Sequence, residues 1–291
     1  MRKIKILIPV YNDWQSAFKL LENINSEISN LQEEFSVIIV NDASSEARPE
    51  ISLNLDNLKS LQIINMKENR GHARCNASGL KYIYEREEFD YVIPMDGDGE
   101  DRPEEIVQFI DNLNYNPENP IVGQRVKRSE GIFFKFCYYI HKIITFFFTG
   151  QSIKFGNYTC LPRSVVEKLV KEKATWSSFS GSLAKVAKDR ATVPSTRGNR
   201  YFGPSKMSFI NLIKHSLSII AVFRIGVIFR SALFYIVYLF LIFQNITIIM
   251  TIPLILIIVL IVAILIISRR ENIEEFNNSL TNILDIVKIK S

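Results

Sequence analysis

Short apolar runs alternate with helix-periodic segments in the first part of the chain. Four runs rich in Ile, Val and Leu have the length of buried strands and lie at residues 4–9, 36–41, 61–65 and 91–95. Segments with a helical spacing of apolar residues lie at about 13–29, 71–86 and 103–113. Strands that alternate with helices in this way are typical of an α/β domain with a mainly parallel sheet.

Polar residues follow each predicted strand. These segments are Tyr11-Asn12-Asp13, Asn41-Asp42-Ala43-Ser44, Asn69-Arg70-Gly71-His72 and the run from Asp96 to Asp101. Ligands of open α/β sheets bind at the carboxyl ends of the strands, so we expect the functional site there. No G-x-G-x-x-G or G-x-x-x-x-G-K-[ST] pattern follows a strand, and the sequence therefore does not support a standard dinucleotide or P-loop site.

A long uncharged segment predicts a membrane anchor. From Ser231 to Ser268, 38 consecutive residues carry no charge and are mostly Ile, Leu, Val and Phe. A single helix of that length would be about 57 Å long, roughly twice a hydrocarbon core of about 30 Å. Two membrane passes are therefore favoured over one, and over a buried helical hairpin of a soluble protein.

Two positions could hold the turn between the passes. A turn at the polar pair Gln244-Asn245 gives spans near 225–243 and 246–267, and this division is preferred. A turn at Pro253 instead gives spans near 231–249 and 253–268.

Basic residues flank the uncharged segment on both sides. They are Lys206, Lys214, Arg224, Arg230, Arg269 and Arg270. The positive-inside rule then predicts that both flanks, and with them the soluble part and both termini, lie in the cytoplasm. In the preferred division Arg230 lies inside the first span, and its side chain would have to snorkel toward the near interface.

These patterns divide the chain into four parts. We expect a soluble domain at 1–205, an amphipathic juxtamembrane segment at 206–230, a two-pass hairpin at 231–268 and a tail at 269–291. Apolar residues at three- and four-residue steps in the tail predict an amphipathic helix, on the membrane surface or against the soluble domain. The aromatic segment 131–148 is interpreted either as an interfacial helix beside the hairpin or as a buried helix of the soluble core.

Composition narrows the class of protein. The 291 residues are 47% hydrophobic and 22% charged, which excludes intrinsic disorder. The net charge of +5 is compatible with nucleic acid, anionic lipid or phosphorylated ligands. Because the basic residues are interspersed with apolar helices and form no stripe or recognition helix, nucleic acid is set aside.

The three cysteines do not form a recognisable framework. Cys75, Cys137 and Cys160 are odd in number, and no C-x-x-C or Cys/His spacing connects them. This argues against a disulfide framework or a structural zinc, and favours a reducing, cytoplasmic setting.

The acidic pair Asp96-Gly97-Asp98 is the most informative local pattern. Two carboxylates separated by one small residue at the end of an apolar strand can share Mg²⁺ or Mn²⁺, which prefer oxygen ligands and a phosphate partner. A solvated acidic turn is the alternative. An EF-hand is disfavoured because an apolar strand precedes the pair and Pro103 follows it early.

Several motifs together resemble the family 2 glycosyltransferases. Across residues 4–125 they are Ile8-Pro9-Val10-Tyr11-Asn12-Asp13, Ile39-Val40-Asn41-Asp42-Ala43-Ser44, Asn69-Arg70-Gly71-His72-Ala73 and Met95-Asp96-Gly97-Asp98. Further matches are the run from Asp96 to Glu104, Gly123-Gln124-Arg125, the run from Asn157 to Arg163, and the run from Arg200 to Lys206. With the hairpin, this set is similar to the polyprenyl-phosphate glycosyltransferases, the group that contains dolichol-phosphate mannose synthase and bactoprenol glucosyltransferase.

The resemblance implies a GT-A fold, the nucleotide-diphospho-sugar transferase type, and a set of donor contacts. Pro9, Tyr11, Asp13 and Asp42 would surround the base and ribose of the donor, with Gly97 nearby. Asp96, Asp98 and Glu100 would ligate a metal that bridges the diphosphate, with Glu100 standing where the family usually has Gln. Arg70 and His72 would bind donor phosphate, although a loop that caps the following helix is an equal alternative.

The resemblance also implies phosphate contacts. Arg125, Arg200, Ser205 and Lys206 would hold phosphates of the acceptor or donor, and Arg125, Arg200 and Lys206 are expected to act in catalysis together with the two aspartates. Asn157 stands where many relatives carry Asp, so no general base is nominated. A lipid phosphate is already an ionised oxygen nucleophile near pH 7, and a strong base is not required.

The expected function is that of a membrane-anchored glycosyltransferase. It would move a sugar from a UDP- or GDP-sugar to undecaprenyl or dolichyl phosphate, with Mg²⁺ or Mn²⁺ and with inversion at C1, and a homo-oligomer is compatible with this. One alternative is an enzyme of the same fold that acts on a saccharide or lipid-linked glycan. Another is a non-catalytic membrane scaffold that binds a nucleotide-sugar.

Overall fold

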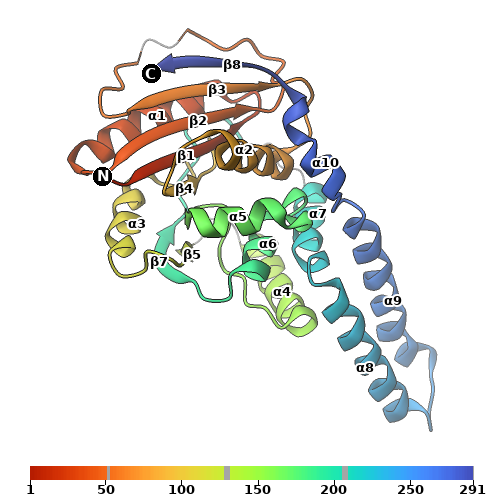
Figure 1. The fold of residues 1–291 in the computed structure, drawn as a ribbon. Helices are drawn as coiled ribbons and strands as arrows, with labels where there is room; N and C mark the ends of the chain where they lie inside the picture. The colour runs from red at the N-terminus through yellow and green to blue at the C-terminus, as the bar shows by residue number, and fades with distance from the viewer. Residues whose placement is uncertain (51–52, 128–131, 205–208, 291) are drawn as a thin grey trace.

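The structure is a computed structural model, and it describes residues 1–50, 53–127, 132–204 and 209–290. A mixed sheet with helices on both faces forms the main body, and a two-helix hairpin projects from it (Figure 1). Within the described ranges the sheet has eight strands in the order β7-β5-β6-β4-β1-β2-β3-β8. The strands are β1 (Lys3–Val10), β2 (Glu34–Asn41), β3 (Ser60–Met66), β4 (Tyr91–Pro94), β5 (Ile121–Lys127), β6 (Thr159–Pro162), β7 (Ala191–Thr196) and β8 (Ile283–Lys290).

The centre of the sheet is parallel, as the sequence pattern predicts. Strand β1 pairs in parallel with both β2 and β4, and β2 pairs in parallel with β3. Antiparallel pairing is found toward the margins, between β4 and β6, β5 and β6, and β3 and β8. The helices of the main body are α1 (Trp14–Glu27), α2 (His72–Arg86), α3 (Ile106–Leu113), α5 (Arg163–Lys171) and α6 (Phe179–Val186), with short 3-10 turns at Ile28–Asn30, Pro103–Glu105 and Lys173–Trp176.

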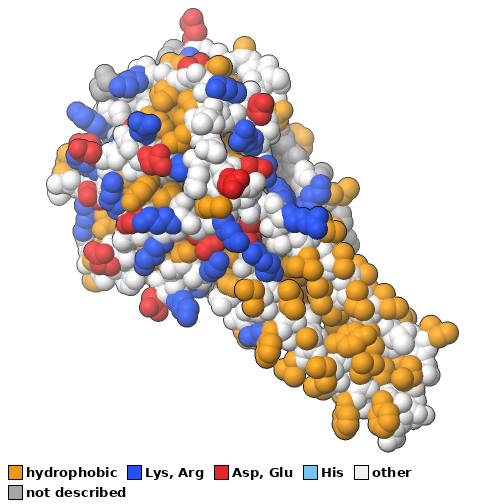
Figure 2. Space-filling model, turned by 45° about the vertical axis from the view of Figure 1, so that its right-hand side comes forward, with side chains coloured by type: hydrophobic (Ala, Val, Ile, Leu, Met, Phe, Trp, Pro, Cys, Tyr) orange, Lys and Arg blue, Asp and Glu red, His pale blue; other side chains and the backbone are white. Residues whose placement is uncertain are grey.

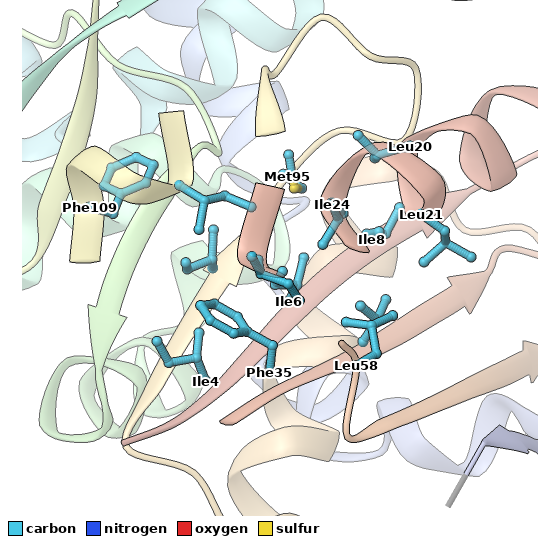
Figure 3. Packing of buried hydrophobic residues seen from close by; sticks show 14 of the residues in the cluster. Ile4, Ile6, Ile8, Leu20, Leu21, Ile24, Phe35, Leu58, Met95 and Phe109 are labelled. Atoms are coloured by element: carbon cyan, nitrogen blue, oxygen red, sulfur yellow. The ribbon is translucent and has the colours of Figure 1, made fainter. Parts of the chain in front are cut away.

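Alternate residues of the central strands bury their side chains on opposite faces of the sheet. On one face Ile4, Ile6 and Ile8 of β1 pack in the cluster that contains Leu20, Leu21 and Ile24 of α1 and Phe109 of α3 (Figure 3). On the other face Leu7 packs in the cluster formed with α2 and α5. Because both faces are covered, the strands are near-continuous apolar runs, as expected for parallel strands.

Two long apolar helices, α8 (Arg224–Ile242) and α9 (Ile248–Ser268), form the projecting hairpin. Both are long and apolar enough to cross a membrane. In the apolar 18-residue stretch of each helix, only 11% and 17%, respectively, is buried within the protein. Figure 2 shows their surface covered with hydrophobic side chains, in contrast to the mixed surface of the main body. Such exposure is incompatible with a core hairpin of a soluble protein and fits two membrane spans.

The hairpin turns at the polar pair Gln244-Asn245, in agreement with the preferred division of the sequence. Helix α9 continues through Pro253, so the alternative turn there is wrong. Helix α8 begins at Arg224 and thus includes residues that the sequence pattern assigns to a juxtamembrane segment; α7 (Phe209–Ala221) precedes it.

Arg230 lies inside α8, and its guanidinium group donates a hydrogen bond to a backbone carbonyl of another helix. An Nη1 hydrogen is donated to the carbonyl oxygen of Phe147, 3.2 Å away, near the end of α4 (Ile132–Thr149). The carboxyl end of a helix carries partial negative charge, which favours a cation there. Helix α4 therefore lies beside the hairpin, and its exposed side chains, including Tyr139, Ile143 and Phe146, exclude a helix buried in the soluble core.

The predicted amphipathic helix of the tail is wrong for most of its length. After α9 the chain forms the short helix α10 (Ile273–Asn277) and a 3-10 turn at Ser279–Asn282, then returns to the sheet as β8. Strand β8 pairs antiparallel with β3, with Ile63 opposite Val287. Apolar residues of the tail, among them Phe276 and Leu280, pack against the domain, and the open edge of β3 offers backbone hydrogen bonds to the strand β8.

A test of the packing uses Gly79, where α2 packs against side chains of β1 and β2. A Cβ atom at this position would lie 2.5 Å from Leu7 Cδ1 and 3.0 Å from Val40 Cγ2, both in buried side chains. Gly79→Val should destabilise the protein by about 1–3 kcal/mol through overpacking. A fall in the thermal unfolding midpoint of the detergent-purified protein measures this effect.

Gly226 provides the matched control for that substitution. A Cβ atom there meets no heavy atom within 4 Å, so Gly226→Val should leave the midpoint nearly unchanged. Equal midpoints for the two variants would show that the α2 contact with the sheet is not close-packed.

Candidate functional site

The carboxyl ends of β1, β2 and β4 meet at one edge of the sheet, because these strands are neighbours and parallel. This edge brings together Asp13, Asp42 and the acidic turn that begins at Asp96. The sequence prediction of a site at this edge is therefore consistent with where the polar segments lie. Residues from later loops complete the arrangement.

Asp96 is held by two side chains from different elements. Its Oδ1 accepts a hydrogen bond from Asn157 Nδ2 at 3.1 Å and lies 3.4 Å from His72 Nε2. His72 is the first residue of α2 and Asn157 precedes β6, and their side-chain nitrogens are 2.6 Å apart. Burial opposes ionisation of Asp96, but His72, Asn157 and two arginines outweigh it, and the pKa of Asp96 is lowered.

Asp98 lies in a different electrostatic setting. Burial, followed by the charge of Asp96, raises its pKa to about 6, although Arg200 favours the charged form. Asp101 adds a third carboxylate: its Oδ2 accepts the backbone N–H of Asp96 at 2.9 Å, and burial raises its pKa well above the usual range. Three carboxyl groups are thus concentrated here, and burial opposes the ionisation of Asp98 and Asp101.

This concentration fits a hard divalent cation. Asp96 and Asp98 supply carboxylate oxygens, the ligand type that Mg²⁺ and Mn²⁺ prefer, and a cation would relieve the repulsion between them. Across the described ranges, no group of three or more His, Cys, Asp and Glu side chains is arranged so that it could hold a metal ion. Mg²⁺ is commonly held by one or two carboxylates together with substrate phosphates, and an aspartate pair is compatible with such a site.

Two glycines allow the acidic turn to pack closely. A Cβ atom at Gly97 would lie 3.1 Å from the Pro9 carbonyl oxygen, so a larger residue would press on the end of β1. Gly99 has φ +88°, and a Cβ atom there would lie 2.5 Å from the ring of Tyr201. The turn is thus enclosed between β1 and a loop from much later in the chain.

That late loop, residues 197–203, lies over the acidic turn. Tyr201 donates its backbone N–H to the Asp98 carbonyl oxygen at 3.0 Å, and Gly198 donates to the Glu100 carbonyl oxygen at 2.8 Å. The Tyr201 hydroxyl accepts from Asn23 Nδ2 of α1 at 2.7 Å. These contacts place the arginines of the loop beside the carboxylates.

Arg200 bridges two of the predicted site residues. Its Nη1 is 2.5 Å from Asp98 Oδ2, and its Nη2 is 2.7 Å from Asp13 Oδ2. Arg197 forms an ion pair with Glu100. The carboxylate of Glu100 is therefore engaged by an arginine, and its role as a third metal ligand stays a prediction.

Asp42 has a clear local role. Its Oδ1 accepts the backbone N–H of Arg70 at 3.0 Å and its Oδ2 accepts that of Gly71 at 2.8 Å. The side chain is buried, which raises its pKa despite these hydrogen bonds. Asp42 thus fixes the loop that leads into α2, where Gly71 has φ +88°, and its contact with the donor base stays a prediction.

The remaining predicted residues surround this centre or lie elsewhere. Tyr11 is exposed just after the end of β1. The Nη2 of Arg70 lies 3.8 Å from Glu68 Oε2. Arg125 on β5 lies near Gly156, and its charge favours the ionised form of Asp96. Ser205 and Lys206 lie outside the described residues. Sequence reasoning missed Arg197, the contact of His72 with Asp96 and the inward carboxylate of Asp101; only the basic spacing Arg197-x-x-Arg200 gave a signal.

Comparison with known sequences identifies the class. The sequence model of glycosyl transferase family 2 matches residues 5–167, and the chain belongs to this family. The predicted family resemblance is confirmed.

Two curated relatives with the same name are similar to most of the chain. The chain is 26% identical, over 220 residues, to undecaprenyl-phosphate 4-deoxy-4-formamido-L-arabinose transferase of Salmonella choleraesuis (strain SC-B67) and to the enzyme of the same name of Salmonella paratyphi B. The match covers 73% of this chain and 65% of each relative, so the chain spans less than two thirds of their length.

Solved structures show the same fold. Mannosyl-3-phosphoglycerate synthase of Rubrobacter xylanophilus aligns with a TM-score of 0.55 and 11% identity over 76% of this chain and 72% of that one. Glucosyl-3-phosphoglycerate synthase of Mycobacterium tuberculosis, in complex with Mn²⁺, UDP-glucose and phosphoglyceric acid, aligns with a TM-score of 0.53 and 12% identity over 78% and 80% of the two chains. The predicted GT-A fold is confirmed.

The role of Asp42 can be tested by exchanging its carboxylate for an amide. In Asp42→Asn only one oxygen remains to accept, and the amide NH₂ would face a backbone N–H. Hydrogen bonds to charged groups stabilise by about 1.5–3 kcal/mol, so amide hydrogen exchange in residues 69–75 should become at least about tenfold faster. Asp285→Asn, at an exposed residue of β8 bonded to Asn65, is the control and should leave this segment unchanged. Unchanged protection in Asp42→Asn would contradict the role of Asp42.

Proposed function

We propose that this protein is a membrane-anchored glycosyltransferase that transfers a sugar from a UDP- or GDP-sugar to a polyprenyl phosphate such as undecaprenyl or dolichyl phosphate. The observation that carries the proposal is the half-buried acidic pair Asp96 and Asp98, faced by arginines, in a family 2 domain joined to an exposed apolar hairpin. The names of the Salmonella relatives, which are undecaprenyl-phosphate sugar transferases, support the acceptor class.

The donor would bind across the carboxyl edge of the sheet. Pro9, Tyr11, Asp13 and Asp42 would contact its base and ribose. Asp96 and Asp98 would hold Mg²⁺ or Mn²⁺, and the mycobacterial synthase of the same fold, which was solved with Mn²⁺ and UDP-glucose, supports this choice. When bound, such a metal neutralises charge on the diphosphate leaving group.

Arginines would complete the diphosphate site. Arg200 contacts Asp98 and Asp13, so the guanidinium already lies where a diphosphate beside Asp98 would need a positive partner. Arg125 lies near Gly156, and its charge favours the ionised form of Asp96. Both can donate two parallel hydrogen bonds to a phosphate, which stabilises the charge that develops on the leaving group.

The reaction balances without a protein base. An oxygen of the acceptor phosphate attacks C1 of the sugar, the bond from C1 to the diphosphate breaks, and the nucleoside diphosphate leaves with its electron pair. Because the acceptor phosphate is ionised near pH 7, no proton must be removed, and an amide at Asn157 is compatible with this step. Arg125, Arg200, Ser205 and Lys206 would orient the acceptor, and attack from the face opposite the leaving group inverts C1.

The hairpin would keep the site at the membrane surface. Helix α8 begins and α9 ends beside the main body, so both basic flanks lie on the same side as the site (Figure 1). A lipid phosphate could then reach the site while its chain stays in the bilayer. The basic flanks and the positive-inside rule support a cytoplasmic location for the site and both termini.

Transfer can be tested directly with a donor panel. Purified protein is incubated with labelled UDP- and GDP-sugars, Mg²⁺ or Mn²⁺, and polyprenyl phosphate, and extracted lipid is assayed for label. Label should enter the lipid, and Asp96→Asn and Asp98→Asn should reduce it to background because each loses a carboxylate charge. Asp285→Asn is the control and should retain transfer.

Other outcomes of this assay would contradict parts of the proposal. Full transfer by either aspartate variant would overturn the metal assignment. Label in a saccharide or lipid-linked glycan, with none in polyprenyl phosphate, would overturn the acceptor. Donor binding without transfer to any acceptor would indicate a non-catalytic scaffold.

Sidedness can be tested by cysteine labelling. In a Cys137→Ser background, in which Cys75 and Cys160 are buried, single cysteines are introduced as Asn245→Cys in the hairpin turn and Lys288→Cys in β8. A membrane-impermeant maleimide should label Asn245→Cys in intact cells and Lys288→Cys only after permeabilisation. The reverse pattern would overturn the cytoplasmic assignment.

A further inference from the structure

The segment that follows α9 contacts the helix that begins at the candidate site. Trp176 donates its indole N–H to Glu275 Oε2 of α10 at 2.9 Å, and Arg74 Nη2 of α2 lies 3.3 Å from the same oxygen. The Arg74 guanidinium carbon lies 5.3 Å from the centre of the Trp176 ring, and this ring stacks on Phe276 at 5.5 Å. We name Arg74, Trp176, Glu275 and Phe276 the exit clamp.

The cation of the exit clamp, Arg74, lies in an electrostatically unfavourable position. Arg74 lies in the first turn of α2, where the helix dipole disfavours positive charge, and no acidic residue occupies that turn. Burial lowers the pKa of Arg74, and Glu275 counters this effect. The Nε of Arg74 is buried, and the described residues offer it no hydrogen-bond partner. The position of Arg74 therefore depends strongly on the carboxylate of Glu275.

The same first turn carries groups of the candidate site. His72 is the first residue of α2 and contacts Asp96, while the amides of Arg70 and Gly71 are held by Asp42. Arg74 lies within one turn of all three. A shift of the first turn would thus move His72 relative to Asp96.

The other end of the clamp is attached to the base of the hairpin. Asn272 caps α10 by accepting the backbone N–H groups of Glu274 and Glu275. Just before it, Glu271 forms an ion pair with Arg224, the first residue of α8, and the side chain of Glu271 is almost fully buried. The chain from α9 into α10 is therefore fixed to the start of the hairpin on one side and to α2 on the other.

We propose that Glu275 is a positioning residue for the donor site: through Arg74 it sets the first turn of α2, and so couples the base of the membrane hairpin to donor binding. The inference rests on the proposed function, but it concerns residues that touch neither donor nor acceptor. Removal of the Glu275 charge should weaken donor binding while the chemical step, once the donor is bound, changes little.

The test is a double-mutant cycle with Glu275→Gln and Arg74→Met. The amide of Glu275→Gln keeps the shape and can still accept from Trp176, so the charge alone is removed. Two quantities are measured: the KM and kcat for the nucleotide-sugar, and the dissociation constant of UDP and of GDP with Mg²⁺ or Mn²⁺ by calorimetry. The second measurement needs no turnover.

Glu275→Gln should raise the KM and the dissociation constant about fivefold or more, with kcat changed less than about twofold, in the range of coupling seen for contacting charged residues. In the Arg74→Met background the same substitution should have little further effect. Glu274→Gln is the matched control, since it lies on the same helix and the described structure gives it no ion pair, and it should behave as the wild type.

Several results would overturn the inference. A lower thermal midpoint for Glu275→Gln with unchanged KM and dissociation constant would show that the clamp only stabilises the fold. Additive effects of the two substitutions would show that Glu275 does not act through Arg74. If the wild type binds UDP or GDP without transfer, the proposed function fails while the dissociation constants still test the clamp; absence of any nucleotide binding would overturn both.

Discussion

The accumulation of carboxyl groups with little access to solvent at the carboxyl ends of β1 and β4 is the constraint on which the site depends. Asp13, Asp96, Asp98 and Asp101 meet there because neighbouring parallel strands end at the same edge. Poor solvation and, after it, the charge of Asp96 raise the pKa of Asp98 to about 6, so ionisation of this carboxyl is opposed by burial and by repulsion. Arg200 reduces this repulsion by forming ion pairs with both Asp98 and Asp13. A divalent cation bound with a diphosphate would reduce it further.

The order of segments along the chain explains how this balance is built. The carboxylates come from the first hundred or so residues, whereas Arg197 and Arg200 come from a loop after β7. The hairpin follows that loop, and the chain then returns to the domain through α10 and β8. The hairpin is therefore inserted into the fold, because strands β1 to β7 precede it in the chain and β8 follows it. The short helix α10, just after the hairpin, contacts α2, which carries His72.

Much of the fold follows from local patterns. The apolar runs at β1 and β2 and the helical spacing of α2 predict those elements with ends that agree with the structure to within a few residues, because buried strands and amphipathic helices impose their own periods. The long uncharged segment similarly predicts a hairpin. By contrast, β8 has no local signal that distinguishes it from a helix, because its pairing with β3 is made across more than two hundred residues.

The features of the candidate site can likewise be separated into those that local sequence predicts and those that depend on the folded structure. The amino-acid sequence alone is enough for the family motifs, the acidic pair Asp96-Gly97-Asp98 and the membrane hairpin, because each depends on residues that are close together in the chain. The folded structure was needed to show that Arg200 bridges Asp98 to Asp13, that Asp42 holds the loop before α2, and that Glu275 meets Arg74. Those partners are distant in sequence, and electrostatic pairing between them depends on where the packed sheet and helices place their side chains.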